Sequence, residues 1–271
     1  MSLLNIFTIE EIKNISNILF FAVVSVVTVL SYLQARKTLF APIRTETFKL
    51  QLKTFEEILL FFQNKSESDF LKGFDLDRIA SLNTLEMADS YVSNFFSNEI
   101  KIDKEARSKV MAPLIGAIFT LEHANKYLKT VDAETPVIKL ATEEKKINNP
   151  AIILANWQKY EQGMVGFTKE YQTQIKELER LAASPLLPKL LREYIGEFKK
   201  IGHENLALIG KTITECAKRM PEHFPNASDM KDFSPDWVWS EFNKKRGNIE
   251  PTANKILDYM NNYLKVEELL Q

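Results

Sequence analysis

Glycine is scarce in this chain, with eight residues among 271. The sequence contains neither a GxxxxGK motif followed by serine or threonine nor a GxGxxG or GxSxG motif. Phosphate-binding loops, dinucleotide-binding turns and nucleophile elbows need those glycines for tight turns and close backbone approach. The chain therefore lacks the signatures of a nucleotide-binding enzyme and of an α/β-hydrolase.

Cysteine and histidine are also few. Cys216 is the only cysteine, which excludes an intramolecular disulfide and a local cysteine cluster. The three histidines, His123, His203 and His223, lie far apart in sequence, and none belongs to an HExxH motif. We therefore expect no metal centre and no other cofactor, and no side chain is predicted to be catalytic.

Neither sign of charge is in excess, because 35 lysines and arginines oppose 36 acidic residues. A global basic field that would attract nucleic acid is therefore missing. HEPN ribonucleases use an arginine and a histidine on one helix, but the segment Arg219-Met-Pro-Glu-His223 is one residue too short. Pro221 is also predicted to break the helix between the two side chains. Nucleic acid is not indicated as a partner.

One long hydrophobic run is present, at residues 15–33. Its nineteen residues carry no charge and no proline. As a helix they span about 28 Å, close to the roughly 30 Å hydrocarbon core of a bilayer. A cleaved signal peptide is the alternative, but Glu10 and Glu11 precede the run and no small-x-small site follows it. The pattern predicts a single retained transmembrane helix.

Basic residues follow this run and predict its orientation. Arg36, Lys37 and Arg44 lie after it, against Lys13 before it. The positive-inside rule therefore places a short tail of residues 1–14 outside and residues 42–271 in the cytoplasm, joined by an anchor and its extension at 15–41. The expected location is the inner or plasma membrane. The basic cluster is also placed to contact anionic lipid.

Small and hydroxylated residues gather on one side of the predicted anchor, at Ala22, Ser25, Thr28 and Ser31. Such residues let membrane helices approach closely and hydrogen-bond, which favours self-association. The alternative is that the hydroxyls bond to their own backbone carbonyls.

Apolar spacings of three and four predict an all-α, bundle-like domain after the anchor. Pro42 should end or kink the membrane helix, and Pro113 should kink a later one. Residues 132–149 are polar and read as a long loop. Helices are expected at about 44–63, 77–96, 104–131, 149–183, 188–219, 234–245 and 250–270.

The helices at 149–183 and 188–219 are expected to form a long antiparallel hairpin, because their connection is short. Apolar residues recur in a heptad pattern along the first of them, which leaves open an internal hairpin or an intermolecular coiled coil. An aromatic cluster precedes Lys244-Lys245-Arg246, and it could either bind a partner or pack in the core. The predicted partner or oligomer face is Trp157, Tyr160, Met164, Phe167 and Tyr171, and the aromatic patch is Trp237, Trp239 and Phe242.

These features favour binding over bond-making. The first hypothesis is a single-pass, membrane-anchored helical protein that acts through self-association or a cytoplasmic protein partner. The second, by analogy of layout alone, is a bacterial toxin or antiphage-defence effector that perturbs the membrane when triggered. The third is a membrane-tethered ribonuclease without a recognisable motif.

Overall fold

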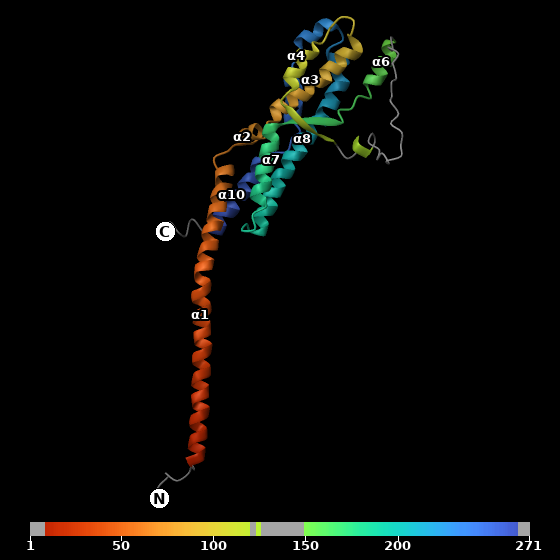
Figure 1. The fold of residues 1–271 in the computed structure, drawn as a ribbon. Helices are drawn as coiled ribbons and strands as arrows, with labels where there is room; N and C mark the ends of the chain where they lie inside the picture. Colours follow the sequence, from red (N-terminus) through yellow and green to blue (C-terminus); the bar gives the residue numbers. More distant parts are fainter. Residues whose placement is uncertain (1–8, 120–122, 126–148, 265–271) are drawn as a thin grey trace. The chain divides into compact units, whose positions relative to one another are not determined.

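The computed structural model describes residues 9–119, 123–125 and 149–264 (Figure 1). The chain divides into two compact units, Met1–Glu57 and Ile58–Gln271. The second unit is predominantly helical with one two-stranded sheet, which confirms the predicted all-α, bundle-like class. Its elements after α1 are α2 (Glu67–Gly73), α3 (Leu76–Phe95), α4 (Lys104–Met111), β1 (Leu114–Phe119), α6 (Pro150–Trp157), β2 (Met164–Thr168), α7 (Lys169–Ala182), α8 (Lys189–His223), the 3-10 helix η1 (Ala227–Asp232), α9 (Asp236–Asn243) and α10 (Glu250–Leu264).

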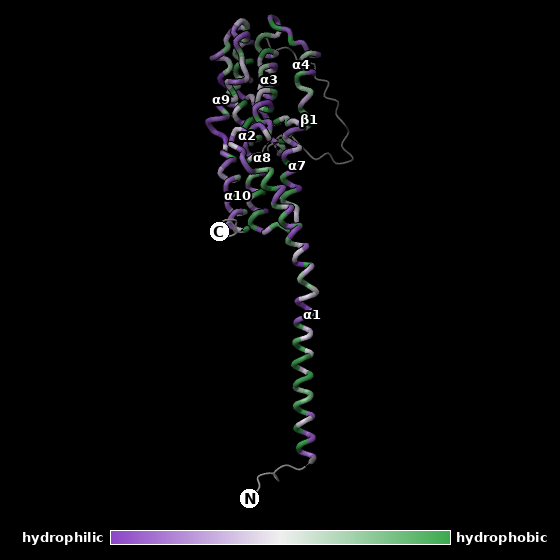
Figure 2. Tube along the Cα trace, turned by 90° about the vertical axis from the view of Figure 1, so that its left-hand side faces the viewer, coloured by the Kyte–Doolittle hydropathy of each residue, from purple (hydrophilic) through white to green (hydrophobic). Residues whose placement is uncertain are grey.

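The first unit consists of most of helix α1, which runs from Ile9 to Phe62. Every described side chain from Glu10 to Leu50 is exposed, and the apolar stretch is visible along α1 in Figure 2. The helix does not end at Pro42, where the sequence predicted an end or a kink and a new helix from 44. Pro42 has no backbone donor, so α1 continues past it with one helical hydrogen bond missing.

Two left-handed residues surround α2. Asn64 (φ 57°) follows α1, and Asp75 (φ 53°) lies between α2 and α3. Asparagine and aspartate tolerate this conformation better than other non-glycine residues, so they suit the sharp reversals that end a helix. The amide of Asp75 donates to the carbonyl of Lys72 at 3.0 Å, as in a helix C-terminal turn. α2 is therefore set off from its neighbours by two tight bends.

The core of the second unit centres on α8, which packs against α3, α7, α9 and α10. Phe198 of α8 is fully buried, and its ring lies 4.9 Å from that of Phe62, 5.1 Å from Phe70 and 5.8 Å from Phe74. The helices predicted at 77–96, 188–219 and 234–245 are confirmed as α3, α8 and α9. α10 confirms the described part of the helix predicted at 250–270, and 132–148 of the predicted polar loop lie outside the described residues.

The helix predicted at 104–131 is wrong. α4 ends at Met111, and after Pro113 the chain forms strand β1, which pairs antiparallel with β2 from Phe119↔Met164 to Leu114↔Thr168. Gly116 makes this pairing close, because a Cβ there would lie 2.6 Å from the ring of Phe167. The apolar run after Pro113 therefore satisfies its backbone across the sheet instead of continuing a kinked helix.

The continuous helix predicted at 149–183 is also wrong. α6 ends at Trp157, β2 follows, and only α7 continues the helical pattern. α7 and α8 do pack together, joined by the short connection predicted for a hairpin (Figure 1). Buried Asn83 of α3 holds β2 in place: its amide donates to the Gly166 carbonyl at 2.9 Å, and its oxygen accepts from the Gly166 amide at 2.8 Å.

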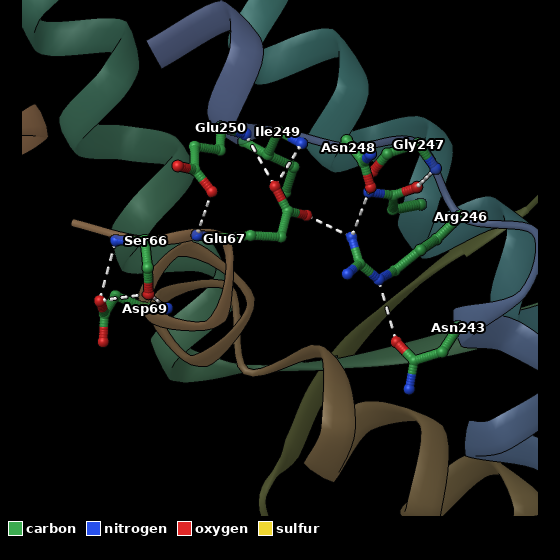
Figure 3. A network of polar contacts seen from close by, with 10 residues as sticks. Ser66, Glu67, Asp69, Asn243, Arg246, Gly247, Asn248, Ile249 and Glu250 are labelled. Atoms are coloured by element: carbon green, nitrogen blue, oxygen red, sulfur yellow. Dashed lines mark hydrogen bonds and ion pairs between the residues drawn. The ribbon is translucent and has the colours of Figure 1, made fainter. Parts of the chain in front are cut away.

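Two glutamates cap each other's helices at the start and the end of the second unit (Figure 3). One carboxylate oxygen of Glu67, in α2, accepts from the amides of Ile249 and Glu250 at 2.8 Å each, where α10 begins. The carboxylate of Glu250 accepts from the amide of Glu67 at 3.0 Å. The other oxygen of Glu67 pairs with Arg246. Carboxylates are favoured at helix N-termini, where backbone amides lack partners, so each acid stabilises the other's helix.

Replacing Glu67 by alanine should lower the stability of the second unit by about 1–3 kcal/mol, because a mostly buried arginine and two helix amides lose their acceptor. The measurement is the urea midpoint of the full-length protein in detergent, followed by tryptophan fluorescence. Glu222→Ala on the exposed surface of α8 is the matched control and should change the midpoint little. Equal midpoints for the two variants would contradict this role of Glu67.

Candidate functional site

α1 is the one helix within the described part of the chain that is long and apolar enough to cross a membrane. None of its apolar window is buried by protein. Ala22, Ser25, Thr28 and Ser31 are exposed on it, as are Arg36, Lys37 and Arg44 further along. The hydroxyl of Thr28 donates to the carbonyl of Val24 at 2.8 Å, so this side chain bonds to its own helix in the single chain.

The predicted partner face does not form a helical surface. Trp157 and Tyr171 are buried inside the second unit, and Met164 and Phe167 lie in β2. The indole nitrogen of Trp157 donates to the Ala217 carbonyl of α8 at 2.7 Å, which fixes α6 to the core. The predicted coiled-coil seam is thus divided between two helices and a strand.

The predicted aromatic patch is partly core. Phe242 is fully buried and stacks on Trp239 at 5.2 Å, whereas Trp237 is half-buried beside the end of α8. The guanidinium of Arg219 lies 5.2 Å from the Trp237 ring, and the ring of His223 lies 5.0 Å from it. α8 continues through Pro221, so the predicted break between Arg219 and His223 is wrong.

The second unit has a groove of about 680 Å³, which we call the α3–α4 groove. One side comes from α3, another from α4 and the segment before it, and the third from η1 and Phe233. The volume falls in the range of small-molecule sites in proteins. Its apolar lining is Leu85, Ala88, Val92, Ile100, Ile102, Ala106, Val110, Ala227, Met230 and Phe233.

α4 forms a wall of this groove without being packed into the protein. None of its eight residues is buried, and Val110 of the lining is 45% exposed. Arg107 connects α4 to α3 through two contacts with the Asp89 carboxylate, at 2.7 and 2.8 Å. Asp103 caps the helix by accepting from the amides of Glu105 and Ala106 at 3.0 Å each. A charged pair therefore spans the groove between its two helices.

The charges that line the α3–α4 groove leave a basic surplus. Asp89 pairs with Arg107, and Asp103 accepts from two backbone amides, so the three basic and two acidic side chains of the lining leave a net charge of +1. Lys101 and Lys231 both line the groove at exposed positions, and neither has an ion pair or hydrogen bond among the described residues. The lining thus combines apolar surface with a net positive charge and two ammonium groups that form no ion pair with the described residues.

A second polar feature joins α7 to α8. The hydroxyl of Tyr171 lies 2.7 Å from Nδ1 of His203. Burial raises the pKa of Tyr171 above its ordinary value, and burial, followed by the nearby Lys199, lowers the pKa of His203. Both groups are therefore neutral at pH 7, and their hydrogen bond links the two helices without exchanging a proton.

Within residues 9–119, 123–125 and 149–264, no three histidine, cysteine or acidic side chains gather where they could hold a metal ion. The sulfur of Cys216 is buried, and burial raises the pKa of its thiol. No protein-family model matches the chain, and no curated protein or solved structure is significantly similar to it.

Sequence reasoning did not find the α3–α4 groove. The described chain forms α4, β1, α6, β2, α7 and α8 between Lys101 and Lys231, and no motif connects the two lysines. The one usable signal was Asp103, a plausible helix cap before the mostly polar segment 104–109. A helix with so few apolar residues has no broad apolar face to pack into the core. α4 therefore lies at the surface, where it forms one wall of the groove.

The stability of the second unit should fall as pH drops below about 6.5, because the unfolded chain then protonates His203 more readily than the folded protein does. Because the pKa of His203 is lowered in the folded state, its full contribution to folding stability is present when the pH is above the ordinary histidine pKa. Acid removes it as the pH falls through the folded-state pKa. Urea midpoints of the full-length protein at pH 7.5 and 5.5 measure the effect.

His203→Gln should reduce that difference between the two pH values, and His223→Gln at an exposed position is its control. An unchanged pH dependence in the His203 variant would refute the assignment. The acidic side chains and His123 are the same in all three proteins, and the two variants differ only in which histidine is replaced, so the comparison isolates His203.

Proposed function

We propose that this chain is a single-pass membrane protein whose second unit is a cytoplasmic binding module. The observation that carries the proposal is the uncharged stretch of α1 at residues 15–33, all of it exposed in the structure. Exposed apolar surface of this extent is unfavourable in water and favourable in a lipid hydrocarbon core. Backbone groups of a helix are satisfied internally, as a membrane requires.

Binding is the favoured activity of the second unit, because the α3–α4 groove is a preformed concave surface with an apolar lining and a few polar groups. The polar clusters outside it are explained by the fold. Glu67, Glu250 and Arg246 cap helices, and Tyr171 with His203 ties α7 to α8. Self-association remains a prediction for the proposed membrane helix, through Ala22, Ser25, Thr28 and Ser31.

The cytoplasmic orientation is supported by Arg36, Lys37 and Arg44, which follow the apolar stretch and are exposed on α1. The two other hypotheses, a membrane-perturbing effector and a tethered ribonuclease, remain predictions. No contact among the described residues favours either over a binding module.

Val24→Arg combined with Val27→Arg should release the protein from membranes. Each arginine costs about 3 kcal/mol near the centre of a membrane helix, and both residues are exposed on α1. After carbonate washing and ultracentrifugation, the parent chain should pellet and the double variant should move to the supernatant. Thr47→Arg with Leu50→Arg, at the same spacing outside the stretch, is the control and should still pellet. A carbonate-soluble parent protein would refute the anchor.

Cysteine labelling tests the orientation. A membrane-impermeant maleimide added to intact cells should modify Ser2→Cys and leave Ser240→Cys unmodified, whereas permeabilised cells should show both labelled. Ser240 is exposed in α9, and the native Cys216 is buried, so the background is low. Labelling of Ser240→Cys in intact cells would reverse the proposed topology.

A further inference from the structure

We propose that the α3–α4 groove binds a single-chain amphipathic anion of the fatty-acid class, with its chain on the apolar lining and its carboxylate between Lys101 and Lys231. The inference rests on the proposed function, in which the second unit is the binding part of a membrane protein. It adds the chemistry of the ligand.

The apolar part of the ligand follows from α4. This helix lines the groove with Ala106 and Val110, and none of its residues is buried. The α3 wall of the groove includes the apolar residues Ala88 and Val92, which are buried. Two apolar surfaces that face one another across an open groove gain free energy when an apolar chain fills the space. Arg107 and Asp89 hold the walls in position, so the ligand does not have to assemble the site.

The anionic head follows from the charges. Asp89 pairs with Arg107 and Asp103 caps α4, which leaves Lys101 and Lys231 as the basic side chains of the lining without an ion pair among the described residues and gives the lining a net charge of +1. An ammonium group stabilises a carboxylate by a charge-assisted hydrogen bond, and a neutral or cationic head would leave both lysines unmatched. The charge pattern therefore selects a fatty acid over a fatty alcohol or an alkylamine of the same length.

The size of the groove favours a small molecule over a folded protein. About 680 Å³ lies within the range of small-ligand pockets, and α4 is about 12 Å long, short for a protein interface of ordinary area. The proposed anchor keeps the groove in a cell compartment bounded by lipid, which is a source of single-chain anions.

Photolabelling of the full-length protein in phosphatidylcholine nanodiscs tests the proposal. The probe is palmitate with a diazirine in its chain, and the labelled peptides are mapped by mass spectrometry. Peptides from residues 85–110 and 227–233 should be labelled, in addition to α1, which the nanodisc lipid makes accessible to any probe. The matching diazirine fatty alcohol should label α1 equally and the groove at least about tenfold less, the effect of one charge-assisted bond.

Two variants separate the parts of the claim. Lys101→Glu with Lys231→Glu should lower groove labelling by palmitate about tenfold or more, while exposed Lys176→Glu with Lys218→Glu should leave it unchanged. Ala106→Trp fills the groove from an exposed position that the fold tolerates, and it should abolish groove labelling with α1 labelling intact.

Labelling confined to α1, or equal groove labelling by the acid and the alcohol, would overturn the proposal. Either result in a protein that resists carbonate extraction would leave the membrane anchor standing. A carbonate-soluble protein would instead overturn the proposed function, so the two failures are distinguishable.

Discussion

Water cannot solvate a long apolar helix cheaply, and this constraint governs the organisation of the chain. Residues 15–33 carry no charge, and all of them are exposed on α1. The second unit buries its apolar side chains internally: phenylalanines pack around Phe198, and its helices cover them. The proposed division of labour follows: lipid covers one apolar surface and protein covers the other.

Polar groups give the second unit its specificity. Buried Asn83 takes both backbone groups of Gly166, and Asn205 of α8 does the same with Gly247, at 2.8 and 2.9 Å. Each asparagine thereby fixes a segment far away in sequence to a core helix. A buried amide without such partners is costly, so these bonds select one arrangement of the chain over others that bury similar apolar area.

Local periodicity was enough to predict α3 and α8, because their apolar faces are continuous and pack on helices. It failed between Trp157 and Tyr171, where spacings of three and four imitate a heptad although Met164–Thr168 form a strand. That strand depends on a partner about fifty residues earlier, which a local pattern cannot reveal. The α3–α4 groove could not be predicted for the same reason, since Lys101 and Lys231 come to line one groove only through tertiary packing.

The mutual capping of α2 and α10 has a consequence for biosynthesis. Glu250 emerges from the ribosome 183 residues after Glu67, yet each supplies the acceptor that the other's helix lacks. During vectorial synthesis the Glu67 amide at the start of α2 has no such acceptor until residue 250 has been translated. A ribosome that stalls before Glu250 therefore leaves a nascent chain in which α2 lacks its bonds to the start of α10.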